Sequence, residues 1–254
     1  GARRTMNYRE CYEWGKEKLE DAGVKDAKLD ARLLLESVCH TTTGDLLAHG
    51  DADVSKEQEA AYADRLLRRA RHIPLQHITG VQEFMGLEFL VNGKVLIPRQ
   101  DTEILVEEVM RHLTDQSRIL DVCTGSGCIL FSLLHYSNGC TGVGVDLSPD
   151  ALAVAEQNRD RLGVEGVELI QSDLFEAVEG KFDFIISNPP YIASGQIKEL
   201  MEEVRLHEPV MALDGGEDGL VFYRKILEKG PAYLKRGGGM FLEIGYDQGE
   251  AVRE

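Results

Sequence analysis

The chain has 254 residues, of which 43% are hydrophobic and 28% are charged. A chain of this length and composition folds into one or two globular domains and needs no disulfide or metal staple. Its 28 lysines and arginines stand against 44 aspartates and glutamates, a formal net charge of −16 at pH 7. Such acidity argues against binding a long polyanion, which requires a basic surface. No uncharged apolar run approaches the roughly 20 residues of a membrane span.

The densest basic stretch gives little support for nucleic-acid binding, and the cysteines give little support for a metal site. Residues 65–72 are explained better as a solvated helix face than as a nucleic-acid contact. The cysteines form no CxxC pair and stand beside no histidine cluster at zinc spacing, so we predict reduced thiols and no metal site. We expect a cytoplasmic monomer with no direct nucleic-acid or membrane partner. The five cysteines are Cys11, Cys39, Cys123, Cys128 and Cys140.

Residues 6–74 are predicted to form a small helical domain. Apolar residues recur there at three- and four-residue spacing, and Ser55 with Gln58 has the spacing of a capping box. Pro74 is expected to end the last helix. With no catalytic cluster among them, these helices favour a docking role. The predicted helices are Tyr8–Ala22, Leu29–Cys39, Thr43–His49 and Ser55–His72.

Two changes of pattern follow. Residues 75–98 hold β-forming residues around Gly80, Gly86 and the turn Asn92-Gly93, which predicts a β-hairpin linker. Over residues 99–254 helices and strands alternate, which is typical of an α/β fold with a doubly wound parallel sheet. The predicted helices there are 101–113, 127–136, 149–162 and 218–234, and the predicted strands are 118–123, 140–146, 167–171, 182–187 and 239–244.

The first strand of this series runs into a glycine-rich turn. Gly125 and Gly127 permit positive φ and a close approach of the backbone to a ligand at the switch point of the sheet. Asp146 ends the next strand, where a carboxylate can accept both hydroxyls of a ribose or can instead cap the following helix. Asp173 and Leu174 follow the third strand and offer an acceptor for an adenine amino group and an apolar wall. Because no phosphate-binding motif occurs, this pocket favours S-adenosylmethionine over a nucleotide.

The fourth strand is followed by Asn188-Pro189-Pro190-Tyr191. A rigid turn also uses proline in this way, but Asn188 Oδ1 and the Pro189 carbonyl could together accept both hydrogens of a planar NH₂ group. Such a grip would aim the weakly nucleophilic nitrogen at a methyl donor. Tyr191 could stack on the substrate and favour the sulfonium cation. This corner therefore predicts methyl transfer to an amino or amide nitrogen.

With these residues in place, the chain resembles the HemK/PrmC family of protein-(glutamine-N5) methyltransferases. The Asn188–Tyr191 motif alone is shared with DNA adenine methyltransferases, and the N-terminal segment and the Glu208–Leu220 stretch make the resemblance to this family more specific. It extends from Tyr8 onward through Pro74–Gly80, Phe84–Leu87, Ile97–Glu103, Asp121–Gly127, Val145–Ser148, Ser172–Phe175, Asn188–Tyr191, Glu208–Pro209 and Leu213–Leu220.

The resemblance implies a class I, Rossmann-like methyltransferase that modifies the Gly-Gly-Gln glutamine of class I peptide-chain release factors. It implies that the helical domain helps to bind the release factor and that Asn188, Pro189, Pro190 and Tyr191 bind the glutamine, with Asn188, Pro189 and Tyr191 catalytic. The implied cofactor contacts are Cys123, Thr124, Gly125, Ser126, Gly127, Asp146, Leu174 and Asn188, beside Asp173 from the loop pattern.

The sequence departs from the family at two places. Cys123 stands where the family often has glycine, and the sequence ends at Glu254, just after the fifth parallel strand, so we expect the last strands of the class I sheet to be absent. The roles of five further polar residues stay open between helix capping and the site. They are Arg99, Asp101, Glu103, Glu208 and Asp214.

Two other functions remain possible from the sequence. A DNA or RNA base-amino methyltransferase would use the same pair of acceptors, but would need a basic surface and a pocket for a flipped base. A non-catalytic regulator that binds S-adenosylmethionine would not need an intact Asn188–Tyr191 corner. The acidity and the corner favour the glutamine methyltransferase.

Overall fold

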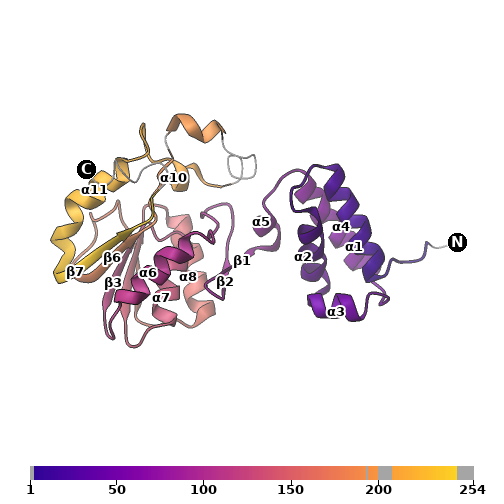
Figure 1. Ribbon diagram of the computed structural model, residues 1–254, viewed down its shortest axis with the longest axis horizontal. Coiled ribbons are helices and arrows are strands. Elements are labelled where there is room, and N and C mark those ends of the chain that lie inside the picture. Colours follow the sequence, from indigo (N-terminus) through magenta and orange to yellow (C-terminus); the bar gives the residue numbers. More distant parts are fainter. Residues whose placement is uncertain (1–2, 193, 200–207, 245–254) are drawn as a thin grey trace. The chain divides into compact units, whose positions relative to one another are not determined.

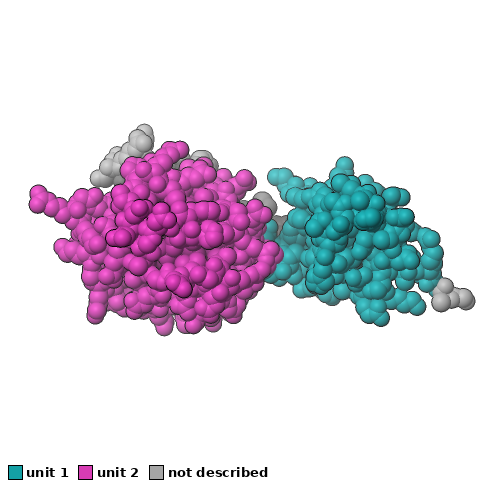
Figure 2. Space-filling view, turned by 90° about the horizontal axis from the view of Figure 1, so that it is seen from below, with its two compact units in different colours: residues 1–80 teal, residues 81–254 magenta. Residues whose placement is uncertain are grey.

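The computed structural model describes residues 3–192, 194–199 and 208–244. The chain divides into two compact units, residues 1–80 and residues 81–254, which Figure 2 distinguishes by colour. In the described residues no helix has the length and apolar character needed to cross a membrane.

The first unit is helical, as its periodicity predicts. Ser55 and Gln58 form the predicted capping box, and Asn7 and Glu10 form a second one. Leu19 and Tyr62 are fully buried in its core. The prediction for residues 75–79 was wrong, because they form a helix that Pro74 begins and the left-handed Gly80 ends. The helices are α1 (Tyr8–Asp21), α2 (Ala27–Cys39), α3 (Thr43–Ala48), α4 (Lys56–Ala70) and α5 (Leu75–Thr79).

The second unit opens with the predicted hairpin, formed by β1 (Val81–Phe84) and β2 (Leu87–Leu90). Its turn is Met85-Gly86 rather than Asn92-Gly93. Both turn residues have positive φ, 52° and 73°, as a type I′ turn requires. The hairpin turn therefore lies earlier in the chain than the sequence suggested.

Five parallel strands form the sheet in the described part of this unit, in the order β5-β4-β3-β6-β7 (Figure 1). The strand order reverses beside β3, which places the switch point where β3 and β6 end. The strands are β3 (Arg118–Val122), β4 (Thr141–Asp146), β5 (Val167–Gln171), β6 (Phe182–Ser187) and β7 (Leu234–Leu242).

Helices cover both faces of the sheet, as predicted. Side chains of α6, α7 and α8 share one buried cluster with Ile119, and α11 contributes Ile226 to the cluster on the other face. Short helical turns complete the unit. The elements are α6 (Thr102–His112), α7 (Cys128–His135), α8 (Pro149–Leu162), η1 (Ser194–Glu199), α10 (Val210–Leu213), α11 (Val221–Lys229) and η2 (Gly230–Tyr233).

The last predicted helix and strand have different bounds in the structure. Helix α11 ends at Lys229 because Gly230 and Pro231 tighten the chain into a 3₁₀ turn. Strand β7 begins at Leu234, five residues before the predicted start. The glycines within it pair closely with β6: a Cβ on Gly238 would lie 2.8 Å from the Asp183 carbonyl oxygen.

Candidate active site

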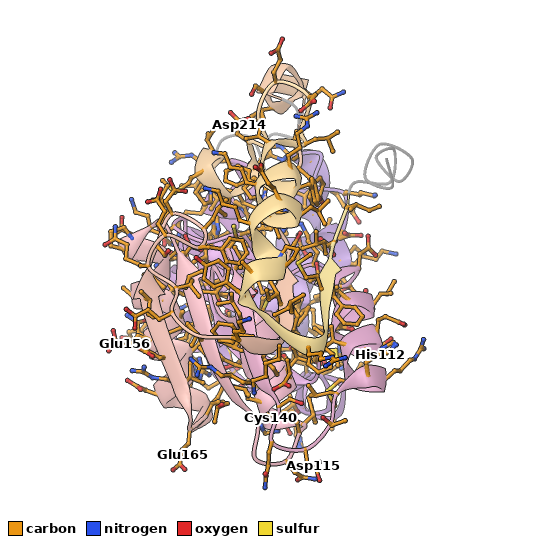
Figure 3. All side chains as sticks on the ribbon, turned by 90° about the vertical axis from the view of Figure 1, so that its left-hand side faces the viewer. His112, Asp115, Cys140, Glu156, Glu165 and Asp214 are labelled. Carbon is orange, nitrogen blue, oxygen red and sulfur yellow. The ribbon has the colours of Figure 1, made fainter. Side chains whose placement is uncertain are left out.

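A cavity of about 280 Å³ opens at the carboxyl ends of the strands. Figure 3 shows Asp214, near this edge, at the opposite end of the unit from Cys140 and Asp115. The cavity is walled by residues 94–99, by the loops after β3, β4, β5 and β6, and by residues 209–212. The predicted site residues that line it are Cys123, Thr124, Gly125, Ser126, Asp146, Asp173, Leu174, Asn188 and Pro190.

The glycine-rich turn exposes backbone to the cavity. Gly125 has φ 56°, and a Cβ placed on it would meet nothing within 4 Å, so the turn is open on that side. Gly127 has another role, because a Cβ there would lie 2.2 Å from the Phe131 ring. Gly127 does not line the cavity. Cys123 also has positive φ, 62°, which shows why glycine would suit its position.

Asp146 is held by the turn that it faces. Its Oδ2 accepts from the Gly125 N–H at 2.9 Å and its Oδ1 from the Ser148 N–H at 3.0 Å. Ser148 is itself the N-cap of α8 through its side chain, so Asp146 is not needed as the cap. Each carboxylate oxygen retains capacity for a further hydrogen bond. Burial raises the pKa of Asp146, while these backbone hydrogen bonds lower it.

Asp121 supports the same turn from below. Its side chain is fully buried, and Thr124 Oγ1 donates to its Oδ2 at 2.8 Å. Its Oδ1 has no hydrogen-bond partner among the described residues. Burial raises the pKa of this carboxyl to about 7.

Asn158 is a supporting residue that is not among the site residues predicted from the sequence. It is fully buried on α8, and its Nδ2 donates at 3.0 Å both to the Ser126 carbonyl and to the Leu90 carbonyl. Its Oδ1 accepts from the Leu90 N–H at 2.6 Å. Asn158 therefore fastens the glycine-rich turn to strand β2. An asparagine in a helix gives no local signal of such a role.

The Asn188–Tyr191 corner follows β6 directly. Asn188 Oδ1 is buried, lines the cavity wall and has no hydrogen-bond partner among the described residues. Pro189 and Pro190 are buried and Tyr191 is half-buried. Pro190 lines the cavity, whereas Pro189 and Tyr191 do not. Burial, and then the nearby Glu243 carboxylate, raise the pKa of Tyr191.

A second segment holds this corner in place. The Ile192 N–H donates to the Leu213 carbonyl at 3.1 Å, and the Gly215 N–H donates to the Ile192 carbonyl at 2.8 Å. Gly215 packs closely: a Cβ there would lie 2.7 Å from the Pro190 carbonyl oxygen and 2.8 Å from Tyr191 Cα. Asp214 Oδ1 accepts from Ser194 Oγ and from the Gly216 N–H, so it shapes this segment.

The remaining open residues take different places. Arg99 lines the cavity and forms an ion pair with the buried Glu208. Glu103 accepts from the Met85 N–H at 2.9 Å and so fastens the hairpin. Asp101 is exposed and makes no side-chain cap for α6. In the described residues no group of three potential ligands could hold a metal ion.

The cavity fits S-adenosylmethionine. The open side of Gly125 admits a ligand against the backbone, Asp146 has acceptor capacity for ribose hydroxyls, and Asp173 lies exposed at the rim. The fold and this site define a class I S-adenosylmethionine-dependent methyltransferase.

Comparison with known proteins narrows this class. Two family models match the chain: the PrmC N-terminal domain over residues 10–80 and the methyltransferase small domain over residues 99–227. A release factor glutamine methyltransferase of Geobacter sulfurreducens is 42% identical over 245 residues, 96% of this chain and 86% of that protein. One of Agrobacterium fabrum is 40% identical over 92% of this chain and 83% of its own length. The chain therefore belongs to the release factor glutamine methyltransferase family.

Solved structures agree with the fold. A methyltransferase from Pyrococcus furiosus matches with a TM-score of 0.51 at 20% identity, over 75% of this chain and 82% of that one. At this identity the likeness supports the fold alone.

Proposed function

We propose that this protein transfers a methyl group from S-adenosylmethionine to the side-chain amide nitrogen (N5) of the glutamine in the Gly-Gly-Gln motif of class I peptide-chain release factors. The observation that carries the proposal is the unpartnered Oδ1 of Asn188, which is buried at the cavity wall beyond β6. A buried oxygen without a donor is costly, and a carboxamide NH₂ of a substrate would satisfy it. The named relatives supply the substrate class.

The corner would orient the nucleophile. Asn188 Oδ1 and the Pro189 carbonyl would each accept one hydrogen of the carboxamide and favour a pyramidal nitrogen whose lone pair is free. The two buried prolines keep both acceptors in place without backbone N–H groups that would compete. Orientation of this kind can contribute up to roughly 7–11 kcal/mol to lowering a barrier.

The other half of the cavity would hold the cofactor. We assign Cys123–Gly127 to the methionine and ribose portions, Asp146 to the ribose, and Asp173 with Leu174 to the adenine. When bound, S-adenosylmethionine supplies a methyl group on a positively charged sulfur. Leu174 is buried, has a positive φ of 53° and lines the cavity.

The organisation of the chain follows the same proposal. Residues 6–74 would dock the release factor, and residues 99–254 would carry out the reaction. Residues 75–98 would link these two domains. We further propose a cytoplasmic monomer with no direct nucleic-acid partner.

The direct test is methylation of an unmodified release factor with methyl-labelled S-adenosylmethionine, followed by mass spectrometry of the Gly-Gly-Gln peptide. We expect one methyl group on the glutamine. A release factor with that glutamine replaced by glutamate is the control and should take up no label. Label elsewhere, or none, would contradict the proposal.

A base-amino methyltransferase is not favoured. It shares the acceptor chemistry of the corner, but residues 81–254 contain 15 lysines and arginines against 30 aspartates and glutamates. Such a unit lacks the excess positive charge on which nucleic-acid affinity depends.

A further inference from the structure

The half-buried Arg99 and the buried Glu208 form an ion pair with several hydrogen bonds at the edge of the cavity. Arg99 Nη1 donates to Glu208 Oε1 at 2.9 Å and Nη2 donates to Oε2 at 2.5 Å. The Glu208 side chain is 1% exposed and that of Arg99 is 39% exposed. This fork-to-fork geometry is the strong form of a charge-assisted hydrogen bond, and lysine cannot reproduce it.

The pair joins two walls of the cavity. The backbone of Ile97 bonds both members of the pair. Its N–H donates to Glu208 Oε1 at 3.1 Å, and its carbonyl accepts from Arg99 Nη1 at 2.9 Å. Pro98 and Arg99 line one wall, and Pro209 immediately follows Glu208 in the other. The fork therefore fixes the approach to α6 against the start of α10.

Beyond Glu208 the chain leads to the substrate corner. Residues 208–216, which we call the supporting segment, contain α10 and then pair with Ile192 through the Leu213 carbonyl and the Gly215 N–H. The pair also lies close enough to act electrostatically on Tyr191: Arg99 lowers the pKa of that phenol and Glu208 raises it. One end of the supporting segment is thus held by Arg99, and the other end holds the corner.

We propose that Arg99 and Glu208 are positioning residues for methyl transfer, which hold the supporting segment and through it the Asn188–Tyr191 corner. This inference rests on the proposed function and deepens it. The cofactor half of the cavity has its own supports in Asp146 and Asn158. Loss of the fork should therefore slow transfer while leaving cofactor affinity nearly unchanged.

The test uses the full chain with Arg99→Lys, which keeps the charge and removes the fork, and with Glu208→Gln, which keeps the shape. Each variant should lower kcat on the release factor about 100-fold, the size of effect that a displacement of about 1 Å produces. The dissociation constant of S-adenosylmethionine, measured by calorimetry, should stay within about twofold. The double variant should lose little more than either single one, because both remove the same interaction.

A matched control is the exposed fork between Arg224 and Asp218, whose side chains are 59% and 47% exposed. Arg224→Lys should leave kcat within about twofold of wild type. If Glu208→Gln does not fold, Arg99→Lys tests the positioning role by itself, because its lysine can still neutralise the charge of Glu208.

Three results overturn parts of this scheme in different ways. Wild-type kcat in Arg99→Lys, with an active wild type, removes the positioning role and leaves the proposed function intact. Equal losses of kcat and of cofactor affinity would place the Arg99–Glu208 pair on the cofactor side of the cavity and would also rule out the proposed positioning role. A wild-type protein that does not methylate the release factor removes both proposals together.

Discussion

The two units each bury an aspartate, and they treat its charge differently. In the helical unit, Asp30 is 5% exposed and accepts from Arg69 Nε at 2.8 Å. In the catalytic unit, Asp121 is fully buried, bonds the Thr124 hydroxyl, and keeps an Oδ1 with no partner among the described residues. Asp30 lies beside a cation, whereas burial raises the pKa of Asp121 to about 7 and so disfavours its charged form. Ionisation of Asp121 therefore costs free energy directly beneath the glycine-rich turn that follows β3.

The two units also differ in net charge. Residues 1–80 contain 13 basic and 14 acidic residues, and residues 81–254 contain 15 and 30. Nearly all of the chain's net negative charge, −15 of −16, thus belongs to the unit with the cavity. A negative field attracts a cationic sulfonium cofactor and a basic partner and speeds their encounter. The ion-paired buried aspartate thus lies in the helical unit, and the excess of acidic residues lies in the unit with the cavity.

The largest expected effect breaks the compensation in the helical unit. Arg69→Met would remove the 2.8 Å bond from Arg69 Nε to the buried Asp30 carboxylate and the 3.0 Å bond from Arg69 Nη1 to the Ile73 carbonyl, and should destabilise this unit by about 3–5 kcal/mol. Trp14, the chain's single tryptophan, packs edge-to-face on Tyr62 in the same unit, so its fluorescence in urea reports the unfolding. Affinity for S-adenosylmethionine should not change.

The control for that variant is the exposed ion pair of Glu13 with Lys16. Glu13→Gln should shift the tryptophan-detected stability by less than about 0.5 kcal/mol. An equally small shift in Arg69→Met would show that the Asp30–Arg69 pair does not stabilise the unit, and the contrast between the two aspartates would disappear.

The next effect concerns the unpartnered oxygen of the catalytic unit. Asn188→Ala should lower kcat about 100- to 1,000-fold, as the loss of one preorganised polar group in an active site does. The melting temperature should hold, since Asn188 Oδ1 has no hydrogen bond to lose among the described residues. Asn138→Ala, at an exposed position, is the control. Full activity in Asn188→Ala would refute its role.

A smaller loss is expected from crowding the corner. In Gly215→Ala the new methyl group would lie 2.7 Å from the Pro190 carbonyl oxygen, so the corner must shift. We expect kcat to fall about 100-fold or less, with cofactor affinity intact. Gly195→Ala has open space around its Cβ and should be neutral. Wild-type kinetics in Gly215→Ala would mean that the position of the corner is not critical.

The parts of the fold that local chemistry determines could be predicted from the sequence. Helix α8 has the predicted bounds, because Ser148 and Pro149 begin it and Gly163 ends it. Strands β5 and β6 also match the prediction. The start of β7 could not be found, because its glycines suit a strand only when β6 lies close beside them. Helix α5 was missed because five residues carry too little periodicity.

The site, too, contains residues that could be predicted from the sequence and residues that could not. The glycine-rich turn, Asp146 and Asn188 follow strand ends in the sequence, and the structure brings them to one cavity. The side chains that hold this machinery could not be predicted. Asn158 bonds Leu90, and Glu208 bonds Arg99, residues far apart in the chain whose meeting depends on the completed fold. Sequence patterns identify the groups at strand ends, and tertiary contacts select their supports.

The smallest expected effect concerns Asp121, the buried aspartate of the catalytic unit. The pKa of Asp121 is about 7 in the folded protein and near 3.8 when unfolded, so the folded form holds a proton that the unfolded form has released. The contribution of Asp121 to stability should therefore fall as pH rises from about 4 to about 7 and level off above it. Asp121→Asn cannot ionise and should remove about 2 kcal/mol of this decline between pH 5 and pH 7, measured by urea unfolding at each pH. The exposed Asp115→Asn should keep the wild-type slope. An unchanged slope in Asp121→Asn would show that this carboxyl finds compensation after all, as Asp30 does in the helical unit.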